Sequence, residues 1–479
     1  MSIRAALRWH HPRAVRRAIL AAGALATIAA SAVSVFVHPL VGIALLVGVG
    51  LAPLILRSVD AAFLAVVAVI ALLPFAALPL GIGFNPTLLD LVLGALYLIW
   101  AFRLATREQT TLRRPPLSAL VGLLVGLMVV AFLAGLSQET PTKNQMRVFG
   151  ELVLGAGLFF IVANLVTDRA ALRRVFLALV GCGTLAAVVG LVLYALPDGL
   201  EMQLLSLLRV VDYPTGPGVI RYINDDPSRL QRAVGTSIDP NSFGGLLAVL
   251  AALCAPQIAS ARPVVPRRAA MAMTAVMALG VVATVSRGSL IGLAAGLVVV
   301  GLFRDRRLLA ATLLGGAALV ALAGVLPWTA AYVANFVDGL RLEDRSTQMR
   351  LGEYRDALRL IGRYPLLGVG FGGVRDIDLY RGVSSLYLIV ASTIGLAGLA
   401  AFLLALAAAA VRMVLAWRSM AADGLRAVVL GCLAALIAAL VSGVFDHYFF
   451  TYPHAFALLW LIVGLAMGAI RLGAELGSG

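Results

Sequence analysis

A tight polar turn at residues 284–289, with the sequence TVSRGS, carries the arginine best placed to do chemistry. The apolar runs on either side, roughly 269–285 and 289–303, are barely long enough to cross a ~30 Å hydrocarbon layer. Arg287 is therefore expected at or just inside the membrane interface, where an unpaired charge costs about 1–3 kcal/mol. Because Arg287 also begins a helix, free N–H groups and the positive dipole end favour an anion beside it. A phosphate-bearing lipid head group would fit such a site.

A second candidate arginine lies in the segment 345–363, whose pattern predicts an amphipathic helix ended by Pro365. At 100° per residue, Arg350 falls on the apolar face, and most of the other charges fall on the opposite face. The apolar face contains Arg350, Tyr354, Ala357, Leu358 and Ile361, and the opposite face contains Arg355, Asp356, Arg359 and Arg363. Arg350 is thus expected to dock on the membrane domain. A buried ion pair with Glu353, three residues on, stays open as the alternative.

A glycine-rich stretch at 366–373, LLGVGFGG, follows that helix. It resembles a nucleotide-phosphate loop only superficially, because no strand–turn–helix setting surrounds it and no Lys-Ser/Thr follows. The glycines instead predict a flexible loop that passes close to a substrate, with Gly370 near its centre.

The polar segment 197–241 carries two further signals. Alternation on both sides of the turn 224–228, NDDPS, predicts a β-hairpin that includes Arg232. The segment ends in Asp239-Pro240-Asn241, just before an apolar run, which is typical of a helix cap. A functional role for Asp239 stays open beside that structural one.

The elements that must position these residues are membrane helices. Hydrophobic residues make up 61% of the 479-residue chain, charged residues 13%, and the mean hydropathy is +0.99. This composition predicts an all-α, polytopic helical bundle of about fourteen spans. The expected spans are 18–36, 39–56, 62–81, 87–103, 117–136, 147–166, 174–196, 242–259, 269–285, 289–303, 308–327, 384–410, 425–445 and 454–471. We expect one integral membrane domain over 1–479, with outward loops at 197–241 and 328–383.

Arginines in the short loops predict the orientation. They recur before the first expected span and in every second connection, so all lie on one side if both termini are cytoplasmic. The net charge of +15 is then mainly a topology signal. With no soluble basic domain, the chain is not expected to bind nucleic acid. The three cysteines, Cys182, Cys254 and Cys432, fall inside expected spans and are interpreted as core packing.

An ordered set of motifs in the second half of the chain resembles the O-antigen ligase and O-antigen polymerase superfamily. The matching stretches are GTSIDPNSFGG at 235–245, TVSRGSLIGL at 284–293, the R-x-x-x-Y pattern of Arg350 and Tyr354 running into YPLLGVGFGG at 364–373, and SLYLIVASTIGLAG at 385–398. Each motif alone is weak, and the order of the set carries the resemblance.

The resemblance implies a metal-independent, cofactor-free glycosyltransferase in the bacterial inner membrane. Such proteins take a glycan from a polyprenyl (undecaprenyl) diphosphate carrier at the outward, periplasmic face and pass it to a hydroxyl of a glycan or glycolipid acceptor. Arginines at the positions of Arg287 and Arg350, together with Ser286, would hold the diphosphate, since guanidinium groups suit phosphate and stay charged. The residues expected around the substrates are Arg232, Tyr354, Gly370, Ser384 and Tyr387.

The chain departs from the ligase pattern at one important position. Ligases carry a His-Asn pair before a Tyr-Leu, and here that pair is Ser384-Ser385, followed by Tyr387. Serine cannot act as an unaided general base, because its pKa lies far above neutrality. The replacement candidates are Asp446 and His447 in the aromatic-rich turn before the last span, with Asp239 in reserve. The alternative is that this turn only anchors the membrane interface.

Other classes stay open beside the transferase. A lipid-linked oligosaccharide flippase would also have many spans and an outward basic cavity, but would favour charges deep within the first-half spans. Only Asp90 and Glu151 approach that pattern. A peptidoglycan glycosyltransferase of the shape and division family shares the architecture without matching motifs, and a non-catalytic scaffold has least support.

Overall fold

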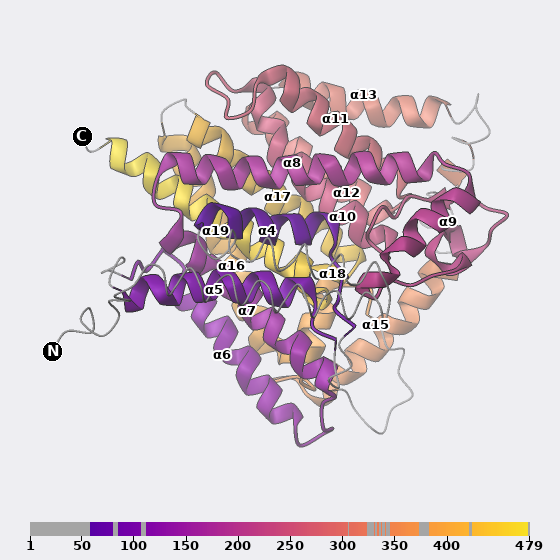
Figure 1. The fold of residues 1–479 in the computed structure, drawn as a ribbon, viewed down its shortest axis with the longest axis horizontal. Helices are drawn as coiled ribbons and strands as arrows, with labels where there is room; N and C mark the ends of the chain where they lie inside the picture. The colour runs from indigo at the N-terminus through magenta and orange to yellow at the C-terminus, as the bar shows by residue number, and fades with distance from the viewer. Residues whose placement is uncertain are drawn as a thin grey trace, which may run out of the picture.

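The computed structural model describes residues 58–79, 85–106, 112–304, 306–322, 345–372, 383–420 and 424–477, with residues 330, 333, 334, 337 and 341 between them. The first two expected spans, 18–36 and 39–56, lie outside the described residues. The described part is a bundle of long helices with one short hairpin (Figure 1). The all-α prediction is therefore confirmed.

The helices of the bundle follow one another with short connections. In chain order they are α4 (Val59–Leu72), α5 (Leu88–Ala105), α6 (Ser118–Gly135), α7 (Lys143–Leu165), α8 (Arg169–Tyr194), α9 (Asp198–Ser206), α10 (Pro240–Cys254), α11 (Arg267–Ala283), α12 (Arg287–Phe303), α13 (Arg306–Leu322), α15 (Arg345–Arg363), α16 (Leu386–Ser419), α17 (Gly424–Phe445), α18 (Tyr448–Thr451) and α19 (Pro453–Gly477). Short 3-10 turns lie at Leu207–Val211, Pro217–Val219, Ile223–Asp225 and Ala255–Ala259.

Eight helices of the described residues are long and apolar enough to cross a membrane: α5, α6, α7, α8, α10 with the turn after it, α16, α17 and α19. The expected count of about fourteen is not confirmed. The expected span 62–81 is shorter in the structure, where α4 ends at Leu72, because Pro74 cannot continue a helix. The apolar helix α12 has 17 residues, which leaves it one short of a full-length candidate.

The core of the bundle is formed by α10, α17 and α19, whose side chains are almost wholly buried. By contrast, α5 and α6 expose many leucines, as expected for a surface that faces lipid. Close approach of the core helices depends on glycine. A Cβ added at Gly288 of α12 would lie 2.9 Å from the Cβ of Phe445, at the end of α17. The expected burial of the three cysteines is confirmed, since all are free and buried.

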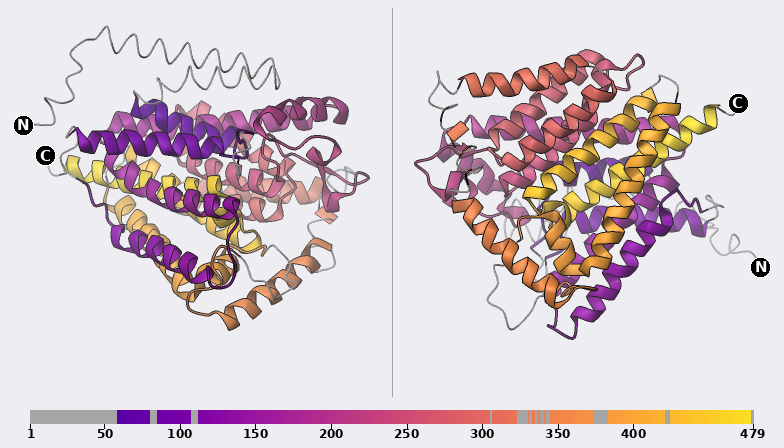
Figure 2. Two further views of the ribbon diagram at one scale, coloured as in Figure 1. Left: turned by 60° about the horizontal axis from the view of Figure 1, so that its bottom comes forward. Right: turned by 180° about the vertical axis from the view of Figure 1, so that it is seen from behind.

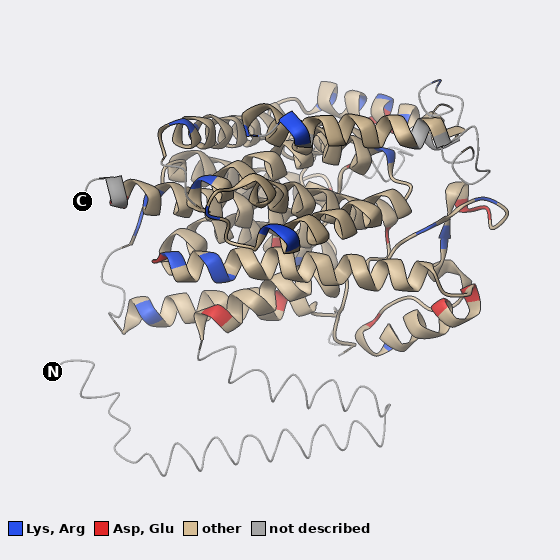
Figure 3. Cartoon of the chain, turned by 90° about the horizontal axis from the view of Figure 1, so that it is seen from above, with Lys and Arg blue, Asp and Glu red and all other residues tan. Residues whose placement is uncertain are grey.

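One end of the bundle carries the polar segments. Strand β1 (Arg221–Tyr222) pairs antiparallel with β2 (Gln231–Arg232), which confirms the predicted hairpin. Acidic and basic residues gather on this hairpin and on α9, whereas the long helices carry few charges (Figure 3). Helix α15 runs along the edge of the bundle toward the start of α16 (Figure 2). We call this end, with β1, β2, α9 and α15, the hairpin end.

Candidate functional site

A cavity of about 700 Å³ opens at the hairpin end. Segments far apart in the sequence form its wall: the hairpin, the start of α10, the turn before α12, helix α15, and the residues next to α16 and α17. We call it the arginine cavity. Its lining includes these predicted site residues: Arg232, Asp239, Ser286, Arg287, Arg350, Ser384 and Asp446.

Four arginines and four carboxylates line this cavity. They are Arg221, Arg232, Arg287, Arg350, Asp225, Asp239, Glu353 and Asp446. Three of the carboxylates accept a hydrogen bond from a backbone N–H group: Asp239, Glu353 and Asp446. The fourth, Asp225, is exposed and lies 3.7 Å from Arg221. The carboxylates are thus partly satisfied by the protein itself, which leaves guanidinium groups to face a ligand.

The turn before α12 presents Arg287 through a strained backbone. Val285 has φ 52°, a left-handed conformation that is an outlier for a β-branched residue. Ser286 caps α12, because its Oγ accepts from the Ser289 N–H at 3.4 Å, and the two hydroxyls lie 2.9 Å apart. The Arg287 guanidinium reaches Thr347 of α15 at 3.5 Å. This turn therefore joins the start of α12 to the helix across the cavity.

Two hydrogen bonds hold the Arg232 guanidinium in the cavity. Its Nε donates to the Thr284 carbonyl at 2.9 Å and its Nη2 donates to Asn241 Oδ1 at 2.5 Å. Burial lowers the pKa of Arg232 to about 10, with Arg350 and Arg221 adding to the effect and Asp239 and Asp446 opposing it. The group stays charged at neutral pH, so it contributes a fixed positive charge.

Arg350 projects from α15 into the same cavity. Within the part of the chain that the structure describes, it forms no hydrogen bond or ion pair. The alternative pair with Glu353 is not formed, because Glu353 accepts the Ser384 N–H at 2.8 Å instead. Arg350 is thus the guanidinium with most capacity left for a ligand.

The predicted faces of α15 are confirmed for most residues. Ala357 is fully buried, whereas Arg355 and Arg363 are exposed and the Arg359 side chain is 75% exposed. Two details are wrong. Leu358 is 59% exposed, although it was expected on the docked face, and the Asp356 side chain is only 13% exposed because Arg359 lies over it at 3.1 Å.

Ser384, the first residue of the Ser384-Ser385 pair, lines the cavity. Two α15 side chains hold its backbone: Glu353 accepts its N–H, and the Tyr354 hydroxyl donates to its carbonyl at 2.9 Å. Tyr354 itself is not part of the lining. Helix α15 therefore fixes the backbone of Ser384 on both sides of the residue.

Asp446 follows directly after α17 and lines the cavity. Burial raises the pKa of this carboxyl above its usual range, and Asp239 adds to the effect, while His447 and Arg350 oppose it. Its Oδ1 accepts the His447 backbone N–H at 2.8 Å and lies 4.0 Å from His447 Nε2. The His447 ring does not line the cavity, and its Nδ1 bonds the Thr451 hydroxyl at 3.0 Å.

Asp239 is both a helix cap and a lining residue of the cavity. Its side chain caps α10 by accepting the Ser242 N–H at 2.8 Å, which confirms the cap, and it also lines the cavity.

Gly370 and Tyr387 lie away from the arginine cavity. The loop 364–372 inserts at a break in α16, where Gly395 has φ 74°. Val369 and Gly370 donate backbone N–H bonds to Ser392 and Thr393 at 2.9 Å, and Leu396 donates to Pro365 at 2.8 Å. Gly370 also abuts Gly135 of α6. The Tyr387 hydroxyl donates to the Leu440 carbonyl at 2.7 Å, between α16 and α17. Helix packing explains both residues.

Sequence reasoning overlooked Arg221. The hairpin register pairs Arg221 with Arg232, which brings both to the cavity. The signal was present in the predicted hairpin, since directly paired residues of two strands project to the same face.

These features define an all-α membrane protein with an arginine-lined cavity at one end of its bundle. Residues 272–403 match the family model described as O-Antigen ligase, a stretch that runs from α11 into α16 and includes Arg287, Arg350 and Ser384. The match supports the predicted resemblance of this part of the chain to the O-antigen ligase superfamily. No curated protein matches the chain.

Proposed function

We propose that this protein transfers a glycan from a polyprenyl diphosphate carrier to an acceptor hydroxyl at the outward face of the bacterial inner membrane, as a ligase or polymerase. The observation that carries the proposal is the convergence of four arginines with Asp446 in one cavity at the end of a membrane bundle. Both termini would then be cytoplasmic and the hairpin end periplasmic.

Arg287 and Arg350 are proposed to bind the diphosphate. They come from two elements of the cavity wall, the start of α12 and helix α15, so a diphosphate bound there could accept bonds from both guanidinium forks. The start of α12, capped by Ser286, adds the positive end of a helix dipole. Arg232, anchored by Thr284 and Asn241, supplies further positive charge that needs no reorganisation. These charges would stabilise the carrier diphosphate as it departs with the electron pair of the sugar–phosphate bond.

Asp446 is proposed to take the proton from the acceptor. The acceptor oxygen forms the new bond to the anomeric carbon as its proton passes to the carboxylate, and the carrier diphosphate leaves. Burial raises the pKa of Asp446, which makes its carboxylate a stronger base than an exposed one. His447 and Asp239 are the neighbouring groups that would tune this charge. The competing route is direct proton uptake by the diphosphate.

One reconstitution experiment separates this proposal from the flippase alternative. The purified protein is placed in proteoliposomes with a carrier-linked glycan and an acceptor glycan, and products are resolved by mass. The proposal expects a longer or transferred glycan and release of carrier diphosphate. Movement of unchanged carrier-linked glycan across the bilayer, with no new glycosidic bond, would instead identify a flippase.

A further inference from the structure

A second cavity, of about 530 Å³, lies at the same end of the bundle. The segment before α5, the start of α7 and the turn before α19 form its wall. Residues that line it include Phe75, Thr87, Asn144, Arg147, Thr451 and Tyr452. Its volume falls within the range of small-molecule sites. None of the motifs that indicate the superfamily lines it.

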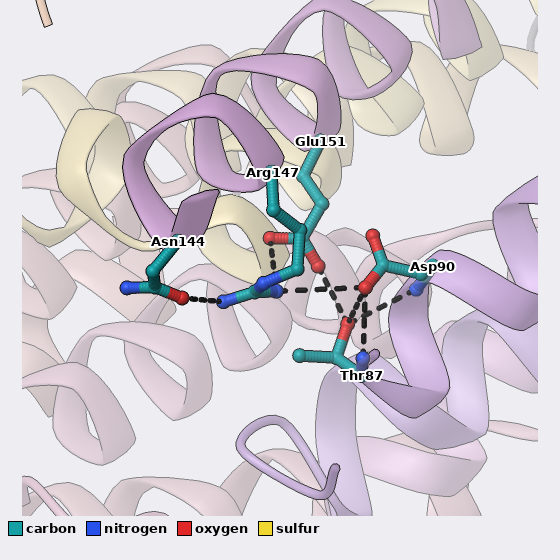
Figure 4. A network of polar contacts seen from close by, with 5 residues as sticks. All are labelled: Thr87, Asp90, Asn144, Arg147 and Glu151. Atoms are coloured by element: carbon teal, nitrogen blue, oxygen red, sulfur yellow. Dashed lines mark hydrogen bonds and ion pairs between the residues drawn. The ribbon is translucent and has the colours of Figure 1, made fainter. Parts of the chain in front are cut away.

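One wall is a rigid polar network that joins α5 to α7 (Figure 4). Arg147 bonds Glu151 at 2.9 Å and Asn144 at 2.8 Å, and lies 3.5 Å from Asp90. The Thr87 hydroxyl contacts the carboxylates of Glu151 and Asp90 at 2.5 and 3.0 Å. These mutual bonds fix the orientation of the polar side chains before any ligand arrives, which lowers the entropic cost of binding.

Another part of the lining is aromatic. The Phe75 ring stands edge-on to Tyr452 and His454, with centroids 5.3 and 4.9 Å away, and the Tyr452 and His454 rings stack at 5.7 Å. Sugar rings carry C–H groups on their faces and hydroxyls around their rims. A lining that combines aromatic rings with amide, hydroxyl and carboxylate groups therefore matches a saccharide.

The charges of the second cavity disfavour an anionic ligand. Its acidic and basic lining residues are Arg147, Glu151 and Asp212. Arg147 is already bonded to Glu151, and Asp212 accepts from Asn85 at 2.8 Å. The second cavity thus has one arginine against two carboxylates, whereas the first has four arginines against four carboxylates. A neutral polyhydroxylated ligand fits better than a phosphate.

The two cavities share the wall that carries the proposed base. Asp446 lines the first cavity and Thr451 the second, and His447 bonds Thr451 at 3.0 Å. Behind them, Ser242 of α10 bonds His454 at 3.2 Å. The turn from Asp446 to Thr451 therefore borders both cavities, which places the second cavity beside the element that carries the proposed base.

We propose that the second cavity binds saccharide units of the acceptor, next to the sugar whose hydroxyl reacts. The proposal rests on the transferase function argued above, and it separates recognition of the acceptor glycan from recognition of the donor diphosphate.

The test measures two probes on one purified protein in lipid nanodiscs. The saccharide probe is the repeat-unit oligosaccharide released from the surface polysaccharide of the encoding bacterium, and the diphosphate probe is geranylgeranyl diphosphate. The variants are Asn144→Ala, at an exposed residue of α7, and Tyr452→Leu, with Arg350→Ala as the matched variant of the first cavity. Thermal melting identifies any variant that fails to fold. If Tyr452→Leu does not fold, Asn144→Ala still tests the second cavity.

Asn144→Ala and Tyr452→Leu should each raise the Kd for the oligosaccharide about fivefold or more and leave the Kd for the diphosphate probe within about twofold. Arg350→Ala should give the reverse pattern. Unchanged oligosaccharide binding in both second-cavity variants would overturn the acceptor site while leaving the proposed function intact. An unchanged Kd for the diphosphate probe in Arg350→Ala would count against the proposed function. The Kd for the oligosaccharide would still test the second cavity independently. In transfer assays the KM for the acceptor should rise and the KM for the donor should not.

Discussion

Arg287 and Arg350 reach the arginine cavity from α12 and α15, which are not consecutive in the chain, and they differ in what holds them. Arg287 contacts Thr347 across the cavity, whereas Arg350 has no protein partner among the described residues. A diphosphate would therefore gain orientation mainly from Arg287 and new bonds mainly from Arg350. Substitutions at the two residues should separate these contributions.

Arg287→Ala should abolish transfer while the protein still inserts in the membrane, because Arg287 provides a guanidinium fork at the start of α12. Arg287→Lys should restore only part of the activity, since a point charge replaces the fork. The measurement is product length and yield in a deletion strain, with membrane abundance as the control. Near-normal product from the alanine variant would contradict the diphosphate role.

Arg350→Ala should lower the transfer rate about tenfold or more, which corresponds to roughly 1.4 kcal/mol of lost transition-state stabilisation. Arg359→Ala on the same helix should change it little, because the Arg359 side chain is 75% exposed and pairs only with Asp356. Rates of the two variants are compared in the reconstituted assay. Equal losses at both residues would show that the cavity face of α15 has no special role.

Asp446→Asn should lower the rate and flatten its dependence on pH. Burial raises the pKa of Asp446 above the ordinary aspartate pKa of about 3.9. The wild-type rate should therefore fall as the pH drops through this raised pKa. The active form is the carboxylate, and activity is therefore present above that pKa and lost below it. The His447→Ala variant, whose ring lies outside the cavity lining, should shift the profile rather than remove it. Wild-type profiles in both variants would leave the turn as an interfacial anchor.

Helix packing sets the precision of the site at the scale of elements. The start of α12 can approach the end of α17 only because residue 288 lacks a side chain, since an added Cβ would lie 2.9 Å from that of Phe445. The two helix ends that this contact joins carry Arg287 and Asp446. Gly292 and Gly296 of α12 also lie close to α17, so the distance between the proposed anion site and the proposed base depends on these small residues, and Gly288 is the one beside the site.

Gly288→Ala should force α12 away from α17, destabilise the protein by about 1–3 kcal/mol and reduce transfer more than that loss of folded protein explains. Gly94→Ala in α5 is the matched control, because an added Cβ there meets no atom within 4 Å. Thermal melting in detergent and transfer rate per folded protein are measured for both. Equal behaviour of the two variants would show that the close contact at Gly288 does not tune the site.

Features that depend on residues close together in the sequence could be predicted from it. The helix start at Arg287, the cavity-facing position of Arg350 and the hairpin at β1 and β2 all follow from local patterns. The place of Gly370 could not, because it depends on the break at Gly395, twenty-five residues later in the chain, which accepts the loop. The second cavity is formed by contacts between the first and last parts of the chain, which no periodicity encodes.

At the scale of the whole molecule, the arginine-rich short connections and the hairpin end are expected on opposite sides of the membrane, with the hairpin end periplasmic. The three native cysteines are buried, so they should give little background in labelling with a membrane-impermeant thiol reagent. Ser228→Cys in the exposed hairpin turn should react in cells whose outer membrane alone is permeable, and Ala261→Cys, exposed in the connection between α10 and α11, should react only after the inner membrane is opened. The opposite pattern would invert the proposed topology.

The loop 364–372, which is inserted at the break in α16, limits how helix α15 can move. Because the backbone of this loop is hydrogen-bonded to Ser392, Thr393 and Leu396, the C-terminal end of α15 is fixed, and any tilt of the helix pivots about that end. Arg350 lies roughly 20 Å along the helix from that point, at 1.5 Å per residue. A tilt of the helix by about 10° would therefore carry its guanidinium by roughly 3–4 Å, more than the length of a hydrogen bond. The tilt angle of α15 therefore decides whether Arg287 and Arg350 can bind the same diphosphate.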